Sequence, residues 1–98
     1  MHTIKVYQLD INNNDIFRDY EFVTRRGTFD INAYHKVWEG KMHINSLNKI
    51  YEVLNMVKPE GYVGHSLSVS DILIVDGEMF YVDDLGFVKL ENMGVPNN

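Results

Sequence analysis

The chain contains no cysteine, only two prolines and no long apolar run. Without cysteine it has neither a disulfide framework nor a thiolate zinc site. No apolar run exceeds that from Ile72 to Val75, which is far below the ~20 residues that span a bilayer. Met1 to Val6 alternate polar and apolar side chains and lack the apolar stretch of a signal peptide. We therefore expect a cytoplasmic protein with no membrane partner.

Basic side chains are nearly absent from the second part of the chain. Residues 59–98 hold seven acidic side chains and a single lysine, whereas residues 1–58 hold eight basic and seven acidic ones. An acidic segment does not wrap a phosphate backbone, because such binding needs cations that displace counterions. It suits the basic surface of a protein, toward which electrostatic attraction steers it. The simpler interpretation is a negative surface that keeps a small protein in solution.

The size and composition indicate one domain. At 98 residues the chain is long enough for one hydrophobic core and too short for two. Hydrophobic residues make up 45% and charged residues 23%, which argues against extensive disorder. We expect a single domain over residues 1–98, with an ordered core over about 3–91 and a flexible tail over 92–98.

The clearest predicted helix runs from Ser46 to Lys58. Its apolar residues recur at the i, i+3, i+4 and i+7 spacing of one buried stripe. Asn45 or Ser46 can cap its first turn, and Pro59 stops it because the residue before a proline disfavours helical angles. A weaker helix, or an extended segment, is predicted over residues 15–22, and a single helical turn over 30–33.

Strand patterns account for most of the remainder. Residues 3–9 and 34–39 alternate apolar and polar side chains, and residues 87–90 form a last short strand. Residues 71–75 and 79–83 flank Asp76-Gly77, which is the strongest short hairpin signal. The sequence thus predicts an α+β fold in the order β-(α)-β-α-β-β-β. Its antiparallel sheet has a C-terminal β-hairpin that packs against one main helix.

The serine-rich approach to this hairpin is a candidate for nucleophile chemistry. A serine nucleophile needs a base within hydrogen-bond reach, and His65 can reach Ser68 or Asp71 only if the chain turns. The simpler interpretation is that serine and aspartate side chains bond to nearby backbone and fix the loop. We favour that interpretation and expect no catalytic residue.

Two further patterns offer alternative functions. Asp83 and Asp84, with Asp71 or Asp76, offer hard oxygen ligands for a divalent metal, but aspartate is also a routine turn former. Arg25 and Arg26 lie among aromatic residues, a combination that binds single-stranded nucleic acid, although a small domain needs its aromatics in the core. The histidines lack ligand spacing and the glycines form no phosphate-binding motif, so no metal or cofactor is expected.

The stretch Gly64-His65-Ser66-Leu67-Ser68-Val69-Ser70-Asp71-Ile72-Leu73, followed by Tyr81-Val82-Asp83 and Leu85-Gly86-Phe87, resembles the YodL-like domains. The resemblance spans about residues 3–90 and is densest over 64–87. Such domains occur in phages and in Gram-positive conjugative elements, often within large polyvalent proteins delivered with incoming DNA. The resemblance implies accessory or counter-defence roles, antirestriction and anti-CRISPR inhibition among them, and assigns no catalytic residue.

Together these observations predict a non-enzymatic counter-defence protein, and more specifically an anti-CRISPR inhibitor of a Cas9-type nuclease. Its partner would be a host defence nuclease or its ribonucleoprotein, bound through a basic surface. The alternatives are a metal-dependent nuclease or nucleic-acid-binding effector that uses Arg25 and Arg26, and a structural adaptor of a conjugative element. The predicted partner-binding residues are acidic: Asp71, Asp76, Glu78, Asp83, Asp84 and Glu91.

Overall fold

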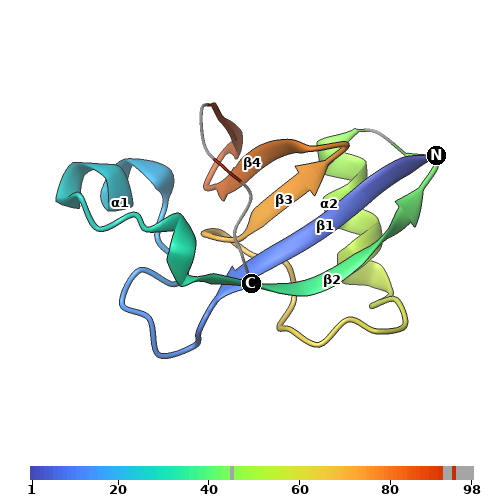
Figure 1. The fold of residues 1–98 in the computed structure, drawn as a ribbon, viewed down its shortest axis with the longest axis horizontal. Helices are drawn as coiled ribbons and strands as arrows, with labels where there is room; N and C mark the ends of the chain where they lie inside the picture. The colour runs from blue at the N-terminus through green and yellow to red at the C-terminus, as the bar shows by residue number, and fades with distance from the viewer. Residues whose placement is uncertain (45, 92–93, 95–98) are drawn as a thin grey trace.

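The computed structural model describes residues 1–44, 46–91 and 94 as a five-stranded sheet with two α-helices (Figure 1). The strand order is β2-β1-β3-β4-β5, and every neighbouring pair is antiparallel. No helix among these residues is long and apolar enough to cross a membrane. The elements are β1 (His2–Leu9), α1 (Tyr20–Arg26), a 3₁₀ turn (Ile31–Ala33), β2 (Tyr34–Met42), α2 (Leu47–Met56), β3 (Ile72–Val75), β4 (Glu78–Asp83) and β5 (Gly86–Leu90).

The sheet is covered on both faces, which explains why its central strands are almost wholly buried. One face carries Ile4, Val6 and Leu73 and packs against Ile50 and Leu54 of α2. The other face carries a second apolar cluster that α1 and the 3₁₀ turn help to cover. In Figure 1, α2 crosses behind the sheet and α1 projects beyond one end of it. The predicted α+β fold, with its hairpin packed on the main helix, is confirmed.

The main helix is slightly shorter than predicted. The Ser46 hydroxyl accepts a hydrogen bond from the backbone N–H of Lys49, so Ser46 is the N-cap. The helix ends at Met56, and Val57 is extended. Because the residue before Pro59 disfavours helical angles, Lys58 does not continue the helix.

The weaker helix begins later than predicted, and the predicted range 15–22 is wrong. Residues 10–18 form consecutive turns, because Asp10 and Asn13 side chains accept hydrogen bonds from backbone N–H groups two residues ahead. The helix starts after Asp19, whose carboxylate accepts from the Phe22 N–H. It ends at Gly27, which adopts the left-handed conformation with φ 70°.

The C-terminal hairpin matches its prediction. Asp76 and Gly77 have φ angles of 51° and 86°, as a tight Asp-Gly turn requires. β2 is longer than predicted and runs through Gly40 to Met42. A Cβ atom at Gly40 would lie 2.2 Å from the Trp38 ring, so any other residue here would displace that ring. Of the predicted tail, residues 92, 93 and 95–98 lie outside the described residues.

Candidate functional site

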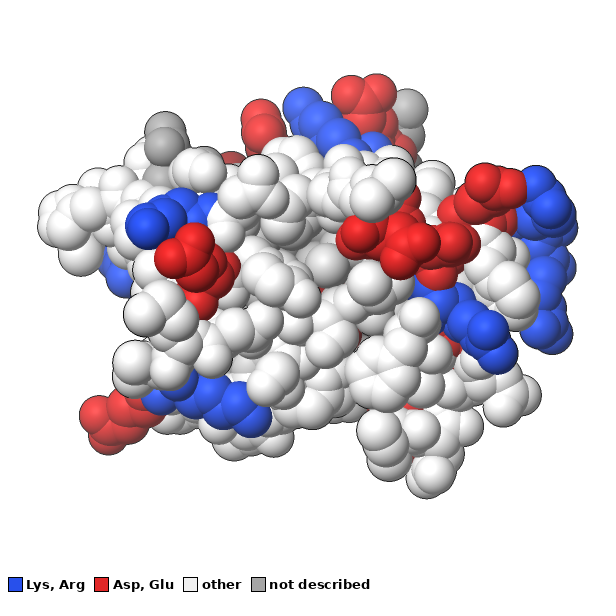
Figure 2. Space-filling model, turned by 180° about the vertical axis from the view of Figure 1, so that it is seen from behind, with Lys and Arg blue, Asp and Glu red and all other residues white. Residues whose placement is uncertain are grey.

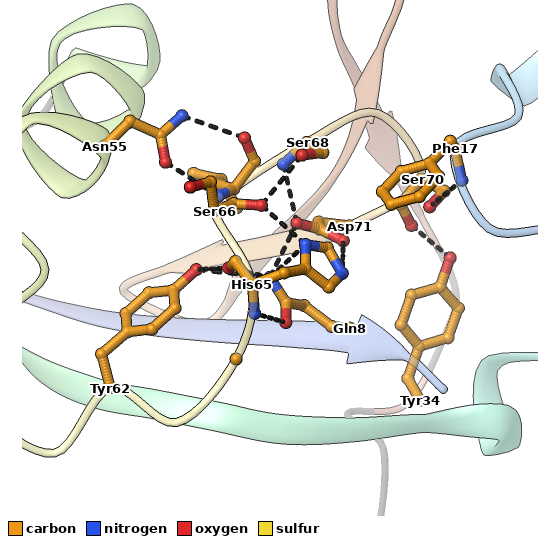
Figure 3. Close-up of polar contacts among 12 residues, drawn as sticks. Gln8, Phe17, Tyr34, Asn55, Tyr62, His65, Ser66, Ser68, Ser70 and Asp71 are labelled. Atoms are coloured by element: carbon orange, nitrogen blue, oxygen red, sulfur yellow. Dashed lines mark hydrogen bonds and ion pairs between the residues drawn. The ribbon is translucent and has the colours of Figure 1, made fainter. Parts of the chain in front are cut away.

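A polar cluster lies at one end of the sheet face that carries α2. Tyr7 of β1 pairs with Ile72 of β3. Gln8 follows Tyr7 and Asp71 precedes Ile72 on the antiparallel strand, so the side chains of Gln8 and Asp71 are neighbours. Gln8 is 1% exposed and Asp71 is fully buried. They meet the α2–β3 loop (residues 57–71), and Figure 3 shows Gln8, His65, Ser68 and Asp71 converging there. A buried polar pair on an apolar face requires hydrogen-bond partners.

Asp71 finds those partners in the loop that precedes it. Its Oδ2 atom accepts hydrogen bonds from the Ser68 backbone N–H at 2.8 Å and from Gln8 Nε2 at 3.0 Å. Burial raises the pKa of the Asp71 carboxyl to about 8, and these two hydrogen bonds only partly oppose the effect. Burial therefore favours the protonated form of this carboxyl in the folded protein.

Gln8 fastens the middle of the loop. Its Nε2 donates to the His65 carbonyl at 2.9 Å, and its Oε1 accepts from the His65 N–H at 3.2 Å. The side-chain amide thus pairs with His65 as another strand would. A Cβ atom at Gly64 would lie 2.0 Å from Gln8 Oε1, so only glycine allows the loop to approach this closely.

The His65 ring faces Asp71 across a short gap. His65 Nδ1 lies 2.7 Å from the Ser66 carbonyl, which can only accept, so Nδ1 carries a proton. Nε2 then faces Asp71 Oδ1 at 3.9 Å. Among the described residues neither of these two buried atoms has a hydrogen-bond partner. Two buried polar atoms from distant parts of the loop thus face each other across this gap.

The serines bond to backbone instead of to the histidine. Ser68 Oγ donates to the Ser66 carbonyl at 2.8 Å, and Ser70 Oγ accepts from the Phe17 N–H at 2.9 Å. Neither of these contacts joins a serine hydroxyl to His65, so within the described residues they do not pair a nucleophile with its base. The prediction that these side chains fix the loop is confirmed.

Two other segments lock the loop from outside. Asn55 on α2 pairs in both directions with the backbone of Leu67, through bonds of 2.8 and 2.9 Å. Phe17 and Ser70 both adopt the left-handed backbone conformation, with φ angles of 65° and 87°. The hydrogen bond from the Phe17 N–H to Ser70 Oγ stabilises both residues in this conformation. The half-exposed Phe17 ring lies edge-on to the His65 ring, with centroids 5.4 Å apart.

We call this cluster the clasp; it comprises Gln8, Asn55, His65, Ser68, Ser70 and Asp71. Sequence reasoning missed Gln8, Asn55 and Phe17, which lie far along the chain from Asp71. The one local signal was a glutamine inside the apolar run of β1.

The predicted acidic residues do not form one surface. Asp71 cannot belong to such a surface, because its side chain is wholly buried in the clasp, and its assignment as a partner-binding residue is wrong. Asp76 and Glu78 lie at the β3–β4 hairpin, whereas Asp83 and Asp84 lie at the opposite end of β4. Glu91 follows Leu90, which pairs with Met79, so it lies near the hairpin.

We call Asp76, Glu78 and Glu91 the hairpin acids. Asp76 Oδ2 lies 2.6 Å from His2 Nδ1, and Oδ1 accepts from the Thr3 N–H at 2.9 Å. The contact with His2 and, to a smaller extent, the bond from Thr3 lower the pKa of Asp76 below its usual value. Glu78 lies 3.8 Å from Lys89, the one lysine of this part of the sequence. All three hairpin acids are exposed.

We call Asp83 and Asp84 the turn acids. Asp83 is half-buried and accepts a hydrogen bond from the Tyr20 N–H at 3.0 Å, so it attaches the first turn of α1 to the sheet. Asp84 is exposed. Within residues 1–44 and 46–91, no three His, Asp or Glu side chains converge as a metal site would need.

The predicted basic residues lie on α1. Arg25 pairs with Glu21 on the next turn of the helix. The guanidinium groups of Arg26 and Arg18 lie over the Phe22 ring, 5.2 and 4.7 Å from its centroid. Figure 2 shows basic side chains gathered at the end of the molecule that α1 forms, with acidic side chains next to them.

The YodL-like domain model matches residues 3–92, which is most of the chain. The chain belongs to the YodL-like domain family. The segment by which it resembles YodL-like domains most densely, residues 64–87, contains four of the six clasp residues and the hairpin. No curated protein and no solved structure matches the chain.

Proposed function

We propose that this YodL-like domain is a non-enzymatic binding protein of a phage or conjugative element. It acts in counter-defence in the cytoplasm of a bacterial host. Its partner is a basic surface of a host defence nuclease or of its ribonucleoprotein, with a Cas9-type nuclease as the specific hypothesis. The hairpin acids and the turn acids make the contact.

One observation carries the proposal, namely the exposed carboxylates at both ends of β4. Glu78, Asp84 and Glu91 are exposed, and Lys89 is the single basic residue after Lys58. Carboxylates displayed in this way raise the association rate with a positively charged groove and compete there with nucleic acid. The clasp supports this role because it holds the long α2–β3 loop rigid beside the strands that carry the acids.

The test uses acids that accept no backbone hydrogen bond within the part of the chain that the structure describes. Glu78, Asp84 and Glu91 are changed together to lysine, and Asp76 and Asp83 are left intact because they hold β1 and α1. The matched control changes Glu21, Glu39 and Glu52 to lysine, which alters the net charge equally elsewhere on the surface.

Each variant is mixed with a guide-loaded Cas9-type nuclease, and complex formation and DNA cleavage are measured. The proposal predicts that the wild-type domain and the control variant bind and inhibit, and that the first variant does neither. Inhibition that survives in the first variant would contradict the acidic contact. Turnover of any nucleic acid by the purified domain would contradict a non-enzymatic role.

The basic end of α1 favours a second candidate, in which the domain contacts single-stranded nucleic acid. Stacking on Phe22 occupies the planar faces of two guanidinium groups and leaves their N–H edges available to a phosphate. Fluorescence anisotropy with labelled single-stranded RNA and DNA tests this candidate. Changing Arg18 and Arg26, the two arginines over Phe22, to glutamine should weaken binding, whereas the same change at Lys36 and Lys41 should not.

A further inference from the structure

A small cavity lies between α2 and the β4–β5 turn. Its volume is about 220 Å³, and α2 lines it with Asn48 and Tyr51. The turn lines it with both turn acids and with Phe87. We call this cavity the turn pocket.

The lining combines ring walls with the exposed acid Asp84, whereas the carboxylate of Asp83 is turned toward α1, where it accepts from the Tyr20 N–H. The rings of Tyr51 and Phe87 meet edge-to-face, with centroids 6.3 Å apart. Among the described residues that line the cavity there is no lysine or arginine. Aromatic faces and carboxylates together attract an organic cation, the first through their quadrupole and the second through charge.

The volume limits the size of the occupant. Sites for cofactors and drug-sized molecules occupy roughly 300–1,000 Å³, so the turn pocket is too small for a nucleotide or a similar ligand. It has room for one long side chain. Among cationic side chains, arginine fits best, because its planar guanidinium stacks on rings and binds a carboxylate through two parallel hydrogen bonds.

We propose that the turn pocket receives an arginine side chain of the partner protein. The guanidinium packs against the ring walls and pairs with Asp84 at the β4–β5 turn. Leu85, which is 99% exposed beside the pocket, adds apolar contact around the anchor. The inference rests on the proposed function, which supplies a basic partner, and it names the residue type that anchors that partner.

The first experiment uses a small probe and needs no partner. N-acetyl-arginine methylamide is titrated into the ¹⁵N-labelled full chain, and backbone amide shifts are followed by NMR. The citrulline analogue is the matched control, because it has almost the same shape without the charge. We expect saturable shifts at Asp84, Gly86 and Phe87 with arginine and none with citrulline.

Two variants locate the binding. Asp84→Asn should weaken arginine binding about threefold or more, as the loss of one partly solvated ion pair does, whereas Glu78→Gln at the other end of β4 should leave it unchanged. Tyr51→Leu removes a ring wall while keeping an apolar side chain, and should also weaken binding. Equal shifts with citrulline, or binding that Asp84→Asn leaves unaltered, would overturn the inference.

A second readout separates this inference from the proposed function. If Asp84→Asn keeps full affinity for the nuclease while Glu78 and Glu91 variants lose it, the pocket is not the anchor and the acidic contact stands. If arginine binds the pocket and no nuclease binds the domain, the pocket inference is supported and the counter-defence role fails.

Discussion

The clasp and the hairpin place the same residue type in opposite physical states. Asp71 is fully buried, and burial raises the pKa of its carboxyl to about 8. Asp76, five residues later, is exposed, and its hydrogen bonds with His2 and Thr3 lower its pKa. Both carboxyls tie distant segments to the sheet, but only Asp71 does so inside the protein. Burial therefore decides whether an aspartate of this segment stabilises the fold, as Asp71 does, or is available to a partner, as Asp76 is.

The largest effect that would test this contrast is the loss of the Asp71 side chain. Asp71→Ala removes the acceptor of the buried Ser68 N–H and of one of the two Gln8 Nε2 hydrogens, while Gln8 Nε2 keeps its bond to the His65 carbonyl. Stranding two buried donors should lower the free energy of unfolding by roughly 2–5 kcal/mol. Urea denaturation measures this change. Asp84→Ala is the exposed control and should stay within about 0.5 kcal/mol of the wild type; equal losses would remove the contrast.

The next effect concerns the close approach of the loop to β1. Gly64→Ala places a Cβ atom against Gln8 Oε1 and against Val37. Overpacking of this kind costs about 1–3 kcal/mol, and thermal or urea unfolding measures it. Gly94→Ala is the control, because a Cβ atom there meets nothing within 4 Å. If Gly64→Ala leaves the free energy of unfolding unchanged, the loop does not pack tightly against Gln8.

The stability of the protein should also depend on the protonation of Asp71. The folded-state pKa of about 8 lies above the ordinary value of 3.8, so the folded state binds this proton more tightly. The resulting stabilisation is full below about pH 4 and is lost as the pH rises toward 8, at up to about 1.4 kcal/mol per pH unit.

Asp71→Asn sharpens this prediction. Asparagine keeps an oxygen acceptor for Ser68 and Gln8 and can donate to His65 Nε2, as the protonated acid would. Unfolding measured from pH 4 to pH 8 should show a falling stability for the wild type and a flatter profile for the variant. Parallel profiles would mean that Asp71 is ionised in the folded protein.

The smallest effect is expected at the exposed carboxyl. Asp76→Asn should destabilise less than Asp71→Ala, because solvent compensates for the lost bonds of an exposed group. Because the pKa of Asp76 is lowered, its contribution is present above the ordinary pKa and is lost as the pH falls below about 4. Acid unfolding of the wild type and Asp76→Asn should therefore converge at low pH. A gap that persists there would assign the effect to packing.

The local part of this fold follows from the sequence, whereas the clasp does not. Periodicity identified α2, and Asp76-Gly77 identified the hairpin, because both signals depend on neighbouring residues. The clasp joins Gln8 to His65 and Asp71, which lie 57 and 63 residues away in the sequence. Only the pairing of β1 with β3 brings them together, and no local pattern reports that pairing.

The same limitation explains the misassigned acid. Charge counting treats every aspartate as exposed, so Asp71 was grouped with the contact residues Asp76 and Asp84. Its burial depends on the register between β1 and β3. The start of α1 was misplaced for a different reason, since Asp10 and Asn13 compete for backbone N–H groups that a helix would use.

The central claim is that exposed carboxylates bind a basic macromolecule, and its most direct test is affinity capture across a range of salt concentrations. The full chain is immobilised and exposed to a bacterial lysate that contains CRISPR and restriction nucleases. The account predicts a nuclease that is retained at low salt, released progressively as the salt rises, and absent when Glu78, Asp84 and Glu91 are lysine. Retention of the nuclease that ignores both salt and these substitutions would contradict the account.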